Sequence, residues 1–177
     1  MKRFTHMVVG VAVGMALGHV FSSVFHFCPV GPCDAVYLGG VLGAFFGVLP
    51  DADVIFHGAG PLRHRGVWSH SLLSSTVLSL LAGSGVFAVE NMGVYNFEPA
   101  WWWSFFVGSV AFFASFFHTW ADSLTRGGAY LLFPLSRRKF RGRWRYDSFI
   151  PNTGLVVAGA LVIGFSLFLC KERLSLP

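Results

Sequence analysis

The sequence predicts an all-α membrane protein, a single polytopic bundle of about five transmembrane helices spanning residues 1–177. Hydrophobic residues make up 54% of the chain and charged residues only 12%, about half the roughly 25% of a soluble domain. The mean hydropathy is +0.62. So few charges cannot cover the surface of a soluble domain, which excludes a disordered chain, a coiled coil and an ordinary cytosolic enzyme.

Five segments approach the length of about 20 apolar residues that a membrane helix needs. They are residues 7–27, 36–49, 71–89, 101–124 and 155–170. The second and fifth are short, so we expect their flanks to extend them or the helices to be tilted.

The first two segments carry glycines at intervals of four residues, which places them on one face of each helix. The two series are Gly10, Gly14 and Gly18, then Gly39, Gly43 and Gly47. Such faces permit close packing of two helix backbones, although glycine is also common in membrane helices without that role.

The distribution of Lys and Arg predicts the orientation, because cytoplasmic loops are enriched in both. Segments 28–35 and 90–100 contain neither residue, whereas the N-terminus has two, the 50–70 loop has Arg63 and Arg65, and the 125–154 loop has seven. We therefore expect a multi-pass protein of the cytoplasmic (inner) membrane with a cytoplasmic N-terminus and a basic cytoplasmic loop at 125–154.

The basic loop also predicts a partner. Aromatic residues alternate with its cations, as in some nucleic-acid-binding proteins, but a loop between two membrane helices lies beside lipid headgroups. We expect an anionic membrane lipid and no nucleic acid. The three cysteines, Cys28, Cys33 and Cys170, lack CxxC spacing. Cys28 and Cys33 are close enough in sequence to pair, but free, inert thiols are favoured.

Most of the histidines and several acids converge at the predicted cytoplasmic face. From separate parts of the sequence come His6, Asp51, Asp53, His64, His70, His118 and Asp122. The orientation was derived from Lys and Arg alone, so this convergence is an independent observation. Ionisable residues near a membrane interior are costly and usually mark function.

These residue types suit a divalent metal. His118 and Asp122 are four residues apart and share a helix face, and imidazole with carboxylate suits Zn, Mn or Fe(II). Singly, each residue also has a structural explanation: His118 and Asp122 can form a buried hydrogen-bonded pair, and Asp51 can cap a turn. Their shared face favours a metal site with one or two ions, zinc being preferred to manganese or iron.

Three motifs resemble those of a known family. Residues 49–53 (LPDAD), 64–72 (HRGVWSHSL) and 118–125 (HTWADSLT) are similar to the LPDxD, HRGxTHS and HxxxDxxT motifs of the YdjM-like family, small membrane proteins described as metal-dependent hydrolases. His6 resembles an early histidine of that family.

The resemblance implies that the metal-site residues are His6, Asp51, Asp53, His64, His70, His118 and Asp122. One departure affects the number of ligands, because Val54 stands where the family has a histidine. Whether the nearby His57 replaces that histidine is left open.

We therefore expect a membrane-embedded hydrolase in which metal-activated water attacks a phosphoester or acyl bond of a lipid-like substrate. Asp51 or Asp53 is the general base if one of them is not a ligand.

Two further pairs of residues are expected to assist the hydrolase. Arg65 and Arg126 are expected to bind an anionic headgroup, and Ser69 and Ser71 to orient the ligands.

The alternative is a non-catalytic metal- or lipid-binding membrane protein or a transporter, in which the polar residues form an ion path. Little besides His19 and His26 continues across the membrane, which favours the enzyme.

Overall fold

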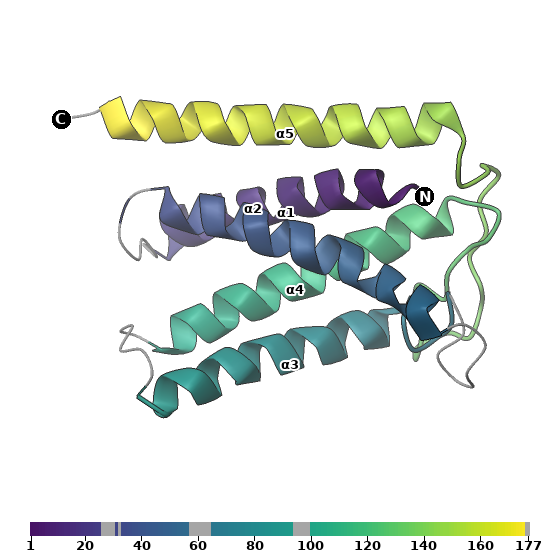
Figure 1. Cartoon of the computed structure of the whole chain (residues 1–177), viewed down its shortest axis with the longest axis horizontal. Helices are drawn as coiled ribbons and strands as arrows, with labels where there is room; N and C mark the ends of the chain where they lie inside the picture. The colour runs from purple at the N-terminus through teal and green to yellow at the C-terminus, as the bar shows by residue number, and fades with distance from the viewer. Residues whose placement is uncertain (26–30, 32, 57–64, 94–99, 176–177) are drawn as a thin grey trace.

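The computed structural model describes residues 1–25, 31, 33–56, 65–93 and 100–175. These residues form five α-helices and one 3-10 helix, as Figure 1 shows: α1 (Arg3–Val24), α2 (Asp34–Val48), η1 (Leu49–Phe56), α3 (Leu72–Asn91), α4 (Ala100–Ser123) and α5 (Phe149–Ser175). Five helical segments are long and apolar enough to cross a membrane. The expected all-α bundle is confirmed.

The two segments that looked short are extended by their flanks. The second runs on from α2 into η1, so that Asp34–Asp53 is long enough to span. The fifth helix begins at Phe149 rather than near 155, so the expected 125–154 loop ends earlier, at residue 148. Pro151 lies in the first turn of α5, where a missing backbone N–H breaks no helical hydrogen bond.

The glycine faces of α1 and α2 pack against each other. A Cβ atom added at Gly14 would collide with the carbonyl oxygen of Gly39, and one at Gly10 with that of Gly43. The two backbones therefore approach at a distance that only glycine allows.

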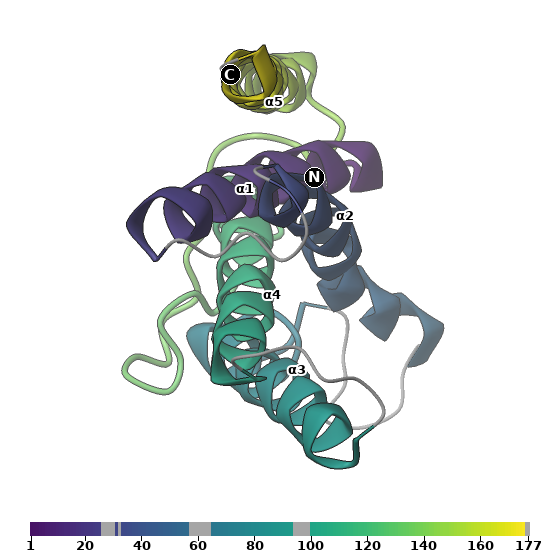
Figure 2. The same cartoon turned by 90° about the vertical axis from the view of Figure 1, so that its left-hand side faces the viewer.

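Helix α4 is the centre of the bundle. It packs against α1, α2 and α3, and Phe106, Val110 and Ala114 form its buried apolar face. Figure 2 shows α3 and α5 at opposite margins of the bundle. Helix α3 rests on α4 and α5 rests on α1, so two helices contribute most of their surface to lipid.

One end of the bundle gathers the N-terminus, η1, the start of α3, the end of α4 and the basic loop (Figure 1). The loop is held by backbone hydrogen bonds, with Ala129 and Phe140 each donating to the other's carbonyl at 3.0 and 2.9 Å. It also contacts the start of α3, where Leu72 N–H donates to the Leu131 carbonyl at 2.9 Å. This end, called the polar end below, carries the candidate site.

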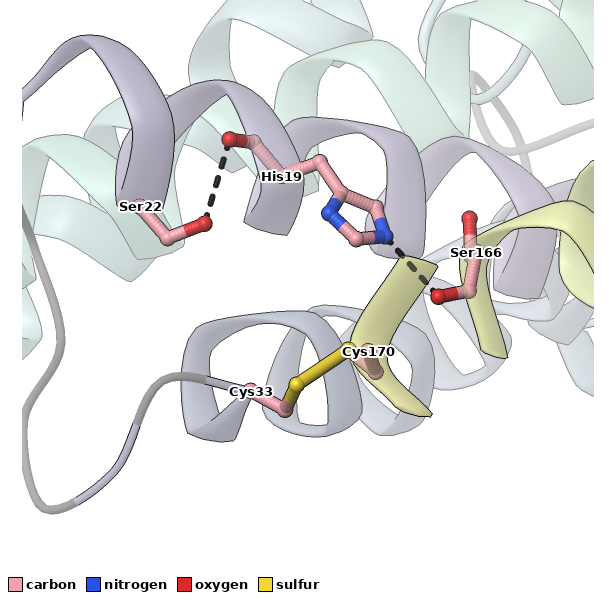
Figure 3. The surroundings of a disulfide bond; sticks show 5 residues. All are labelled: His19, Ser22, Cys33, Ser166 and Cys170. Atoms are coloured by element: carbon pink, nitrogen blue, oxygen red, sulfur yellow. Dashed lines mark hydrogen bonds between the residues drawn. A yellow bond between two sulfur atoms is a disulfide. The ribbon is translucent and has the colours of Figure 1, made fainter. Parts of the chain in front are cut away.

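At the opposite end, Cys33 and Cys170 form a disulfide (Figure 3). The expectation of free thiols at these two positions was wrong. The partners are 137 residues apart in sequence, so no local spacing pointed to their pairing. Cys28 lies outside the described residues. Close to the disulfide, His19 Nε2 on α1 donates to the Ser166 carbonyl on α5 at 3.1 Å.

Candidate metal centre

Four buried side chains meet at the polar end: Asp51 of η1, His70 just before α3, and His118 and Asp122 of α4. One ligand atom from each lies within 4.8 Å of all the others. His70 and Asp122 are fully buried, and His118 is 1% exposed. These four residues are positioned to bind a metal ion.

Local sequence explains how each ligand reaches this point. His118 and Asp122 are one turn apart near the end of α4. The 3-10 helix η1 begins at Leu49, directly after α2, and carries Asp51 in its first turn. Ser71 caps α3, accepting the Ser74 N–H at 3.1 Å, and His70 immediately precedes this cap.

The distances between these atoms suit one ion. His118 Nε2 lies 3.2 Å from His70 Nε2 and 3.5 Å from Asp51 Oδ1. His70 Nε2 lies 3.6 Å from Asp122 Oδ2 and 3.7 Å from Asp51 Oδ1. Ligands at about 2.0–2.2 Å from a tetrahedral ion stand about 3.3–3.6 Å apart, so these side chains need little movement to hold it.

The two imidazoles are oriented for coordination by their other nitrogens. His118 Nδ1 donates to the Gly47 carbonyl at 2.8 Å, which leaves the Nε2 lone pair facing the cluster. His70 Nδ1 lies 2.9 Å from Ser69 Oγ and 3.4 Å from Asp53 Oδ2. Such contacts fix ring orientation and tautomer in metal sites.

Carboxylates govern the charge of His70. Burial by itself lowers the pKa of His70, but hydrogen bonds to Asp51 and Asp53, with the charge of Asp122, outweigh burial and raise it. The same carboxylates that favour a proton on His70 favour a divalent cation beside it.

His6 lies against this cluster from α1. Its ring stacks on His118 with centroids 3.7 Å apart, and its Nε2 lies 3.2 Å from Asp122 Oδ1. The amino group of Met1 also forms an ion pair with Asp122. Within the described part of the chain, His6 Nδ1 has no hydrogen-bond partner.

Arg65 also contacts the cluster, through Asp122. Its guanidinium holds both oxygens of Asp122, with Nη2 at 3.1 Å from Oδ1 and Nε at 3.0 Å from Oδ2. Its Nη1 donates to Thr125 Oγ1 at 3.1 Å, and its backbone N–H donates to Asp53 Oδ2 at 3.1 Å. Arg65 therefore ties the loop before α3 to two carboxylates of the site.

The structure does not bring every candidate into contact with the cluster. Arg126 is exposed, and its Nε donates to the Arg143 carbonyl at 3.1 Å, so it lies in the basic loop. The Ser71 hydroxyl serves the cap of α3 instead of contacting a ligand ring. His64 and His57 lie outside the described residues.

Two groups that contribute to the site were not predicted from the sequence. Thr125 binds the Arg65 guanidinium, and its place in the third motif was the available signal. The Gly47 carbonyl of α2 accepts a hydrogen bond from the His118 side chain of α4, and no sequence pattern marks this contact.

One of three comparisons with known proteins finds a match. The model of a family described as YdjM inner membrane protein matches residues 1–174. Neither a curated protein nor a solved structure matches the chain. Since the match covers nearly the whole sequence and five helices are able to span a membrane, the chain is a multi-pass inner membrane protein that belongs to the YdjM family.

Proposed function

We propose that the protein is a metal-dependent hydrolase that cleaves a phosphoester or acyl bond of a membrane lipid at the polar end of the bundle. The observation that carries this proposal is the group of four ligand atoms from Asp51, His70, His118 and Asp122, whose mutual distances suit one ion. Two imidazoles and two carboxylates suit zinc, and also manganese or iron(II); zinc is the ion that we propose.

A divalent ion held by these four side chains would supply activated water at neutral pH and polarise a carbonyl or phosphoryl oxygen, provided that it takes up water beside the four ligands. Asp53, the candidate base outside the group of four, lies 3.4 Å from His70 Nδ1, on the side of the ring away from Nε2, so in this scheme it orients His70. Asp51, the other candidate base, is a ligand in this scheme. Arg65 orients Asp122 and places a guanidinium where an anionic substrate group can bind.

The buried core favours this hydrolase over an ion path. Beyond the ligands, α4 is lined towards the opposite end by Ala114, Ala111, Val110 and Phe106, all buried and apolar. An ion crossing beside them would lose its hydration without gaining ligands.

We infer that the polar end faces the cytoplasm. The Lys/Arg-rich segments lie there, and the disulfide lies at the other end, which fits an oxidising compartment such as the periplasm.

The orientation is tested with single cysteines in a Cys28→Ser background, placed at exposed Met92 or Arg137. In intact cells an impermeant maleimide should label M92C, and R137C only after lysis. The reverse pattern would place the site outside.

The metal is tested on detergent-purified protein. We expect about one zinc per chain by elemental analysis and less than a tenth of that in His118→Ala. His19→Ala is the matched control, because His19 lies near the disulfide instead of the cluster. Wild-type protein without metal after incubation with zinc, or His118→Ala with full metal, would refute the site.

Hydrolysis is then assayed on a panel of phospholipids with zinc-loaded protein. Products are expected from wild type and none from His118→Ala. A metal-loaded wild-type protein that cleaves no member of the panel would favour the non-catalytic alternative.

A further inference from the structure

A groove of about 320 Å³ opens on the side of the bundle between η1 and α3. Its floor reaches α4 at Ser115, and its walls are almost wholly apolar, formed chiefly by Leu49, Ala52, Leu73, Val77, Leu78 and Leu81. The size is typical of a site for a small molecule. Since α2 and α3 both pack on α4 but stand apart (Figure 2), the groove lies on the lipid-facing side.

The groove runs along the helix axis. Leu73, Val77 and Leu81 are four residues apart, so they stand in line on one face of α3. From Leu73 to Leu81 the helix rises about 12 Å, close to half of the roughly 30 Å apolar thickness of a bilayer. Val77 is 45% and Leu81 66% exposed, so a hydrocarbon chain can enter sideways from one leaflet.

The polar part of the groove lining meets the candidate site. Asp53 and Ser69 line the groove, and both contact His70 Nδ1, at 3.4 and 2.9 Å. A chain in the groove therefore places the bond next to its headgroup beside the ligand cluster, whereas a soluble substrate would have no use for the apolar part.

Cations gather around Arg65, whose backbone N–H donates to Asp53 of the groove lining at 3.1 Å. A Cβ at Gly127 would collide with the Arg65 guanidinium, and one at Gly128 would lie 2.6 Å from Arg141 Cγ, so both arginines border this glycine turn. Burial lowers the pKa of Lys139, and the charges of Arg141 and Arg65 lower it further. Among the described residues, no carboxylate pairs with Lys139 or Arg141, which leaves positive charge for an anion to balance.

We propose that this groove holds one acyl chain of an anionic glycerophospholipid, with the headgroup phosphate directed towards Lys139 and Arg141, next to Arg65. The proposal rests on the proposed function and names its substrate class. The acyl chain matches the apolar length of the groove, and the phosphate matches the cations at its polar end.

The test uses a phosphatidylglycerol that carries a photoreactive diazirine in one acyl chain, with full-length protein in nanodiscs stripped of metal by a chelator. Crosslinks should concentrate on residues 49–53 and 73–81. Val77→Trp fills the groove and should lower crosslinking there at least fivefold. Val162→Trp, at a comparably exposed site on α5 (40%), should leave the crosslinking yield in the groove unchanged. Both variants should match wild type in unfolding temperature and in the metal content measured before the chelator is added.

Competition then tests the headgroup. Unlabelled phosphatidylglycerol should displace the probe at least fivefold more effectively than phosphatidylcholine, and Arg141→Gln should reduce that preference. Crosslinks spread evenly over α3 and α5, or an unchanged yield in Val77→Trp, would overturn the groove. Crosslinking confined to a second copy of the chain would show a dimer interface instead.

The outcomes separate this proposal from the proposed function. Crosslinking in the groove without lipid hydrolysis by zinc-loaded protein would refute only the hydrolase. Hydrolysis that is unaffected by Val77→Trp would refute only the groove.

Discussion

The two ends of the bundle are both held together by contacts between segments distant in sequence, but the chemistry of these contacts differs. At the polar end, His6, Asp51 and Asp122 belong to three different helices and meet through polar contacts. At the opposite end, Cys33 and Cys170 link the start of α2 to α5 through one covalent bond. Each end connects segments that hydrophobic burial alone does not orient, because lipid is as apolar as the helix faces.

The difference lies in reactivity. At the disulfide end, both cysteine sulfurs are bonded to each other, and the neighbouring His19 forms an ordinary hydrogen bond with a backbone carbonyl. The polar end instead concentrates carboxylates and imidazoles in a buried space, where unpaired charge is costly. Arg65 and the Met1 amino group already pair with Asp122, whereas Asp51 contacts the two histidines. A metal ion between these imidazoles and carboxylates would stabilise the polar end, and we expect metal dependence there and not at the disulfide.

The largest effect is expected from Asp122→Ala. The substitution removes a ligand and leaves the Arg65 guanidinium and His6 without the carboxylate they contact. We expect metal content below a tenth of wild type and a loss of stability of about 3–5 kcal/mol, as for other broken buried ion pairs. Elemental analysis and thermal unfolding in detergent measure both.

A metal chelator tests whether the stability of the polar end depends on a bound metal. It should lower the unfolding temperature of wild type and leave that of Asp122→Ala unchanged. Equal shifts in the two proteins would show that the chelator acts elsewhere.

The next effect is expected at the other end. Replacing Cys33 and Cys170 together by serine should cost about 2–5 kcal/mol of stability, while metal content stays at the wild-type level. Cys28→Ser is the control. Loss of metal in the double variant would mean that the two ends are coupled through α5.

Substitutions of Arg65 and of Arg126 should lower the rate of lipid hydrolysis to different extents. Hydrogen bonds to charged groups contribute about 1.5–3 kcal/mol, so Arg65→Gln should lower turnover roughly 10- to 100-fold. Arg126→Gln removes a contact with the Arg143 carbonyl only, and its effect should be several-fold smaller. Equal effects would indicate that both arginines bind the headgroup.

The smallest expected effect distinguishes two neighbouring serines. Ser69→Ala removes the contact between the Ser69 hydroxyl and His70 Nδ1. It should weaken zinc affinity about 10-fold, as for other residues that orient metal ligands. Ser71→Ala removes the cap of α3, at a cost of about 1 kcal/mol, with little change in zinc affinity. Competition with a fluorescent zinc chelator measures affinity, and thermal unfolding measures the cap.

The sequence determined the fold class by composition and by the lengths of its apolar segments. It also showed that glycines recur every four residues on one face of each of the first two segments, but it left open whether these faces pack, and the structure shows that they pack against each other. Four of the seven metal-ligand candidates, Asp51, His70, His118 and Asp122, meet in one group. They were recognisable because few residue types bind metals and because charge is rare in membrane segments.

Tertiary structure alone decided which distant groups touch. It paired Cys33 with Cys170 across 137 residues, turned the His118 ring through the Gly47 carbonyl, and directed Arg65 to Asp122 while leaving Arg126 in the loop. These outcomes depend on how helices cross and rotate about one another. Helical periodicity fixes the face on which a residue lies, but the packing of five helices fixes what that face meets.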